Sequence, residues 1–215
     1  MVHASCAPPQ IHVRNVVFKS HSCPRSVTPP GDFGWMDIID RNSIRRMEID
    51  FADPLTCHLR GISSRRTPDL LDEARCVQRH MQLLIAHPTA LEELHITRYS
   101  LQPRGREIDM DSFQVNLPML RAYDGPFQFY EGFVLGEMIE LLELRHLVGG
   151  YVDTQRVLRT LSKQVHPRIR SLTVCIFDDP IGYLRKISAL YPQLRHVGIS
   201  IWQVHEDEVS HHHAA

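Results

Sequence analysis

A short apolar pattern recurs along the chain and constrains its fold more than any other feature of the sequence. The pattern has apolar residues at its first, fourth and sixth positions, and a clear copy is Leu91-x-x-Leu94-x-Ile96. Further copies begin at Val13, Ile44, Leu120, Ile139, Ile169 and Leu194, of which the copy at Leu120 is the weakest. The fourth and sixth positions alternate with polar residues, which is the period of a β-strand. The sequence therefore predicts a strand at each copy.

Segments between the predicted strands have the residue spacing of helices instead. We expect helices over residues 69–87, 154–165 and 180–191, because apolar residues recur there at three- and four-residue steps. The last of these helices opens at Asp179-Pro180, and its expected apolar face consists of Ile181, Leu184, Ile187 and Leu190. A proline, which cannot continue a helix, falls two or three residues before four predicted strands, at Pro88, Pro118, Pro167 and Pro192.

One unit of strand, helix and proline is too small to bury both its strand face and its helix face. Stacking of neighbouring units buries them together. The predicted fold class is therefore α/β, a leucine-rich-repeat-like solenoid of irregular repeats with a curved parallel sheet on the concave side and helices on the convex side. The alternative is an ordinary α/β domain of unrelated strands and helices. Residues 52–67 hold either an insertion loop or a degenerate unit, and residues 98–116 are expected to form a surface loop.

Composition limits the partners and the compartment. The 215 residues are 43% hydrophobic and carry 24 basic and 25 acidic side chains. This balance argues against a general nucleic-acid or membrane-surface binder, because such proteins normally carry a basic excess. Neither a spanning apolar segment nor a secretory signal is visible. The five cysteines are odd in number and lack a Cys-x-x-Cys pair, so we expect a reduced protein of the cytoplasm or nucleus.

Metal ions and cofactors are not expected. A structural zinc site normally takes four ligands in two close pairs. The pairs His21-x-Cys23 and Cys57-His58 are isolated, and the run His211-His212-His213 lies in the tail.

Catalytic motifs are weak, and we expect no catalysis in this chain. Asp32-Phe33-Gly34 and Asp109-x-Asp111 stand without the motifs that accompany them in kinases or metal-dependent transferases. A nucleophile pair of Cys175 with His146 or His196 stays open as an alternative, because such partners need only be close in space. A spare thiol on a strand is the simpler interpretation.

Four segments of the repeat resemble a known family: residues 91–96, 117–126, 169–174 and 191–196. They are similar to the degenerate leucine-rich repeats of mushroom-type fungal F-box proteins, in which a Leu-Pro-x-Leu-Arg … Gly-Pro unit precedes a helix and a short strand. The resemblance covers about residues 10–202. It implies a non-catalytic substrate-recognition subunit of a cullin-based ubiquitin ligase, in which an F-box binds the adaptor and the repeats hold a target protein.

The chain departs from that family because no F-box is visible in it. The expected organisation is a flexible segment over residues 1–12, a leucine-rich-repeat-like domain over 13–202 and a disordered His-rich tail over 203–215. The ligase adaptor is expected as a partner only if an F-box lies upstream. The alternatives are an α/β enzyme with no recognisable motif and a truncated, non-functional paralogue.

The predicted binding surface is the concave face of the sheet. It is lined by residues between and just after the apolar strand positions: Glu48, Asp50, His95, Thr97, Asp124, Glu143, Arg145, Thr173, His196, Ser200 and Trp202. This mixture of acids, His, Arg and one Trp suits a protein partner better than a polyanion. Trp202 either anchors the partner or covers the core of the last repeat.

Overall fold

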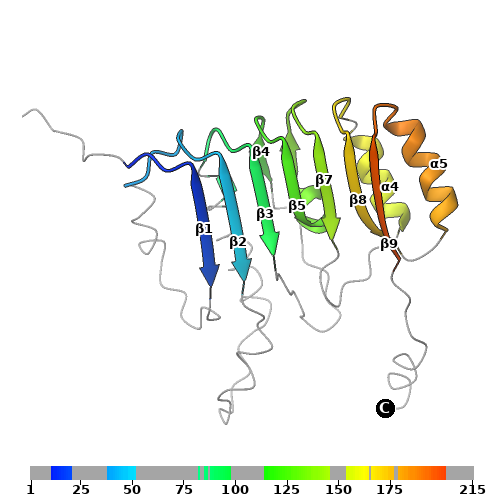
Figure 1. Ribbon diagram of the computed structural model, residues 1–215, viewed down its shortest axis with the longest axis horizontal. Helices are drawn as coiled ribbons and strands as arrows, with labels where there is room; N and C mark the ends of the chain where they lie inside the picture. Colours follow the sequence, from blue (N-terminus) through cyan, green and yellow to red (C-terminus); the bar gives the residue numbers. More distant parts are fainter. Residues whose placement is uncertain are drawn as a thin grey trace, which may run out of the picture.

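The computed structural model of the chain (Figure 1) describes residues 11–20, 38–51, 82, 85–86, 88–97, 114–145, 154–164, 166–176 and 179–201. The predicted segment 52–67, the tail 203–215 and Trp202 lie outside these residues. Of the predicted helix 69–87, only Gln82, Ile85 and Ala86 are described, and they are helical. Within the described part of the chain, no helix is long and apolar enough to cross a membrane.

Seven strands form one parallel sheet, and their order in space follows their order in the chain (Figure 1). The strands are β1 (Asn15–Ser20), β2 (Arg46–Phe51), β3 (Glu93–Thr97), β5 (Ala122–Pro126), β7 (Leu141–Arg145), β8 (Ser171–Ile176) and β9 (His196–Ile201). Each coincides with one copy of the apolar pattern, so the strand predictions are confirmed. The prediction of an α/β fold built on a parallel sheet is confirmed as well.

The parallel register aligns equivalent positions of the pattern in rows across the sheet. One row joins the fourth positions: Val16, Met47, Leu94, Tyr123, Leu142, Leu172 and Val197. Between β2 and β8 this row is almost completely buried, and so are the first positions Ile44, Leu91, Leu120, Ile139 and Ile169. The apolar positions of the pattern are therefore the residues of each unit that face the common core.

The sixth position holds glycine in one strand only among the described copies. Gly125 of β5 pairs with Leu144 of β7, where the other strands place a large apolar residue. The ring of Tyr123 occupies the space instead, since a Cβ added to Gly125 would lie 2.7 Å from the Tyr123 hydroxyl oxygen. That hydroxyl donates a hydrogen bond to the Pro126 carbonyl oxygen at 2.7 Å. The ring also packs edge-on against Phe133, with centroids 5.1 Å apart.

Three short elements lie beside β5; a helix and a short strand after Gly125-Pro126 are what the resemblance implies, whereas the strand before β5 was not predicted. β4 (Val115–Leu117) and β6 (Phe133–Leu135) pair as a second, two-stranded parallel sheet, and α3 (Phe127–Glu131) follows β5 directly. The prediction of a loop over 98–116 is wrong at Val115 and Asn116, where β4 begins; residues 98–113 lie outside the described part. Val115 and Leu117 are buried, so β4 adds to the core.

Two longer helices lie at the C-terminal end of the sheet (Figure 1). They are α4 (Thr154–Lys163) and α5 (Pro180–Leu190), and both agree closely with the predicted ranges. Asp179 caps α5, since its carboxylate accepts a hydrogen bond from the Gly182 amide at 2.9 Å. The four prolines precede the strands by four or five residues rather than two or three, because each strand begins after the first pattern position.

The predicted apolar face of α5 is partly wrong. Ile181 is 65% exposed and Leu184 is 41% exposed, whereas Tyr183 and Ile187 are buried. Tyr183 and Ile187 are four residues apart and so share one face of the helix. The large ring of Tyr183 buries more apolar surface than either exposed aliphatic side chain would, and this sets the rotation of the helix.

Candidate functional site

A row of polar side chains crosses the face of the sheet opposite the core. Glu48, His95, Asp124, Glu143 and Thr173 occupy matching register positions on β2, β3, β5, β7 and β8. Neighbouring positions in such a row are about 4.8 Å apart. The predicted residues are thus brought together, because each lies between the two apolar strand positions of its unit.

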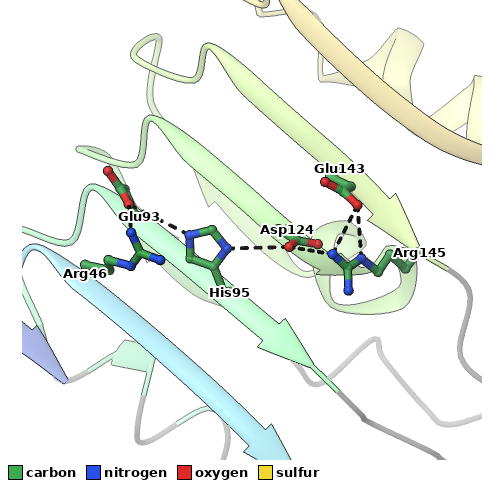
Figure 2. Close-up of polar contacts among 6 residues, drawn as sticks. All are labelled: Arg46, Glu93, His95, Asp124, Glu143 and Arg145. Atoms are coloured by element: carbon green, nitrogen blue, oxygen red, sulfur yellow. Dashed lines mark hydrogen bonds and ion pairs between the residues drawn. The ribbon is translucent and has the colours of Figure 1, made fainter. Parts of the chain in front are cut away.

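The centre of this row is an ion-pair network (Figure 2). Arg145 Nη2 lies 2.7 Å from Asp124 Oδ2 and 3.1 Å from Glu143 Oε1, so one guanidinium serves two carboxylates. His95 Nδ1 lies 3.5 Å from the same Asp124 oxygen. Asp124 therefore sits between an imidazole on one neighbouring strand and a guanidinium on the other.

The network continues to β2 through two residues that are not among the predicted site residues. Glu93 Oε2 lies 3.8 Å from His95 Nε2 and 3.3 Å from Arg46 Nη1. Both residues lie two positions before a predicted site residue on the same strand, so the strand period could have identified them. With them, the network spans four adjacent strands (Figure 2).

Asp124 is held in this network at an electrostatic cost. The residue is only 9% exposed, and among the described residues its Oδ1 atom has no hydrogen-bond partner. Burial raises the pKa of Asp124, and the Glu143 carboxylate raises it further, while Arg145 and His95 lower it. The Arg145 side chain is 48% exposed, so water screens its charge, and desolvation outweighs the ion pair despite the short distance.

The remaining predicted residues lie in different environments. Asp50 is 6% exposed, so the expectation that it lines an accessible face is wrong. Thr97 is half-buried, and His196 and Ser200 are exposed on β9. The role of all these residues in binding stays a prediction.

Cys175 does not form a nucleophile pair with His196. Cys175 aligns with Ser200 on β9, whereas His196 lies four residues earlier, about 13 Å along the strand. The thiol is 9% exposed, and burial raises its pKa, which keeps it protonated. His146, the other possible partner, lies outside the described residues.

Metal-binding clusters are absent from the described residues, where no three His, Cys, Asp or Glu side chains are placed to hold an ion. The pairs His21-x-Cys23 and Cys57-His58 and the motifs at residues 32–34 and 109–111 lie outside them. Comparison with known proteins finds no matching family model, no matching curated protein and no matching solved structure.

Proposed function

We propose that the chain is a non-catalytic, protein-binding repeat domain of leucine-rich-repeat-like, solenoid form. The observation that carries this proposal is the row Glu48–His95–Asp124–Glu143–Thr173, which places side chains of mixed charge in register on one face of the sheet. Such a surface contacts a partner protein through several strands at once.

Backbone hydrogen bonds support the repeat interpretation. At each junction, the carbonyl oxygen of the residue before one strand accepts two amide hydrogens from the next unit. For example, Arg121 O accepts from the amides of Glu140 and Leu141, and Glu140 O accepts from those of Arg170 and Ser171. The same arrangement recurs from Arg14 to His196. Units that repeat one backbone geometry are typical of solenoid repeats, whose neighbours contact only each other.

The exposed parts of the network suit recognition of a folded partner. The side chains of Arg46, Glu93 and Arg145 are 48%, 44% and 48% exposed, so a partner can reach them. Their ion pairs hold the rotamers before binding, which reduces the entropy lost on association.

The finer proposal is that the partner is a ubiquitination target, held for a cullin-based ligase. It is supported by the resemblance of the repeat units to mushroom-type fungal F-box proteins. Its test is adaptor binding by the protein together with any upstream sequence. If that extended protein fails to bind the adaptor, the ligase proposal is wrong, although the protein-binding proposal still stands.

A matched pair of charge reversals tests the binding face. Glu48→Arg changes the polar row, whereas Glu137→Arg makes the same substitution at an exposed turn before β7. Affinity purification from the source cells, quantified by mass spectrometry, should recover a partner with the wild-type chain and with Glu137→Arg. Recovery should fall about tenfold with Glu48→Arg, since reversal of a charge that faces the partner costs about 1.4 kcal/mol or more. Equal recovery by both variants would show that the partner binds elsewhere.

A further inference from the structure

A ladder of charged residues runs along the amino-terminal ends of the strands, separate from the polar face. The residue immediately before each of the seven strands is charged: Arg14, Arg45, Glu92, Arg121, Glu140, Arg170 and Arg195. Amides join the successive positions, with Arg170 N donating to Glu140 O at 2.9 Å and Arg195 N to Arg170 O at 2.8 Å. The charged residues are therefore nearest neighbours across the strand junctions.

Their charges alternate in sign from Arg45 to Arg170, and a like-charged pair stands at each end: Arg14 with Arg45, and Arg170 with Arg195. Glu92 lies between two arginines, 3.6 Å from Arg45 and 3.9 Å from Arg121. Glu140 follows, and then Arg170 and Arg195 stand next to each other, both exposed. Within the described part of the chain, neither of these two arginines makes an ion pair. A carboxylate beside Arg195 would balance it as Glu92 balances Arg45.

The same end of the sheet leaves a strand edge and an apolar face uncovered. Among the described residues, β9 pairs only with β8. Val197 is 43% exposed, whereas Leu172 and Leu142 of the same row are 0% and 1% exposed. A strand edge with free backbone groups can accept an added strand, and alternate side chains of that strand then contact the neighbouring face.

We propose that β9 binds an extended acidic segment of a partner protein as the next parallel strand. In the register of the sheet, a carboxylate lies beside Arg195, and apolar residues two and four positions later lie beside Val197 and Ile199. The chain itself contains this pattern in Glu92-Glu-Leu94-His-Ile96, which already pairs in this way with the preceding unit. Backbone pairing and alternate apolar contacts require a polypeptide, so a nucleic acid does not fit this edge.

A peptide copied from the chain provides the probe. We would measure binding of a fluorescein-labelled peptide, Thr-Ala-Leu-Glu-Glu-Leu-His-Ile-Thr (residues 89–97), to the full chain by fluorescence anisotropy. Arg195→Glu should weaken binding about tenfold, and a peptide with Lys at the position of Glu92 should restore binding to that variant. Arg185→Glu, an exposed reversal on α5, is the matched control and should leave binding unchanged.

Several outcomes would overturn the proposal. They are equal binding by Arg195→Glu and wild type, no binding up to about 1 mM peptide, and displacement of the peptide by a single-stranded oligonucleotide. Circular dichroism of each variant separates lost binding from lost folding. Val197→Asp is a second variant that should weaken binding without changing the charge of Arg195.

The chain's own tail is the competing occupant, because Glu206, Asp207 and Glu208 follow β9 in sequence and lie outside the described residues. Neutralising all three acids should leave peptide affinity unchanged. A gain of about tenfold would assign the edge to the tail and overturn the proposal of a partner strand. Glu48→Arg should also leave peptide binding unchanged, so this proposal and the proposed polar binding face can fail separately.

Discussion

Substitution of Tyr123 and Gly125 by the residue types found at these positions in neighbouring strands tests the strand register directly. In the aligned rows, Leu94 and Leu142 flank Tyr123, while Leu144 pairs with Gly125. The double variant Tyr123→Leu/Gly125→Val therefore gives β5 the apolar pattern of its neighbours. If the rows are correct, the two substitutions compensate each other.

Each single substitution should be costly for a different reason. A Cβ at Gly125 would lie 2.7 Å from the Tyr123 hydroxyl oxygen and 3.1 Å from Ile96 Cβ, and valine adds two methyl groups to it. Overpacking of this kind costs about 3 kcal/mol. Tyr123→Leu removes the hydrogen bond to Pro126 O and leaves a cavity beside Phe133. We expect this variant to lose about 3 kcal/mol of unfolding free energy.

The double variant should lose much less than both costs together. Leucine at position 123 removes the ring that blocks position 125, and valine fills part of the space that the ring leaves. We expect a total loss of about 3 kcal/mol and a favourable coupling of about 2–3 kcal/mol. Urea unfolding followed by circular dichroism measures all four proteins of the cycle.

Gly198→Val combined with Tyr123→Leu is the control cycle. Gly198 lies on β9, where an added Cβ would meet the Thr173 side chain rather than the Tyr123 ring. The effects of these distant sites should add within about 0.5 kcal/mol. If the two stability losses in the Tyr123/Gly125 cycle also add within about 0.5 kcal/mol, the proposed register is refuted.

Three further predictions concern single interactions. Burial raises the pKa of Asp124 above its ordinary value of 3.8. The contribution of Asp124 to stability is therefore most favourable at low pH and is lost as pH rises through the folded-state pKa. Asp124→Asn should flatten this loss in unfolding curves between about pH 3 and pH 8. If stability falls with pH as steeply in Asp124→Asn as in the wild type, Asp124 is not the group responsible. Arg156 Nη2 lies 2.8 Å from Glu131 Oε2 and joins α4 to α3, so Arg156→Ala should cost about 1.5 kcal/mol in chemical denaturation, and a loss below about 0.3 kcal/mol would refute a stabilising pair. Asp179→Ala should cost about 1 kcal/mol by removing the cap of α5, whereas Asp179→Asn should keep most of the stability; equal losses in the two variants would argue against capping.

The sequence predicted the strands of the main sheet because one pattern encodes both local and long-range structure. A unit such as Ile169-x-x-Leu172-x-Val174 has the strand period, and its recurrence also indicates what lies beside it. Residue periodicity did not identify β4, β6 and α3, because three to five residues are too few to show a period. The rotation of α5 was missed because aliphatic spacing alone left out the ring of Tyr183.

The side of the sheet on which each polar residue lies was predictable, but its burial was not. Alternation along a strand places Glu48, Asp50 and Asp124 opposite the core. Their exposure depends on side chains contributed by other units, which one strand's sequence does not specify. Asp124 is buried between His95 and Arg145, whose neighbouring positions follow only from the register of three strands.

Parallel register has an electrostatic cost that explains the position of Arg145. Because equivalent residues align about 4.8 Å apart, the adjacent carboxylates of Asp124 and Glu143 repel each other, and this repulsion adds to burial, the main cause of the raised pKa of Asp124. A cation within the same row would have to replace one of them. Arg145 instead lies two residues further along β7, on the same face, from where its guanidinium reaches both carboxylates. The compensation is incomplete because burial removes the hydration of Asp124, and the half-exposed guanidinium of Arg145 does not fully offset that loss.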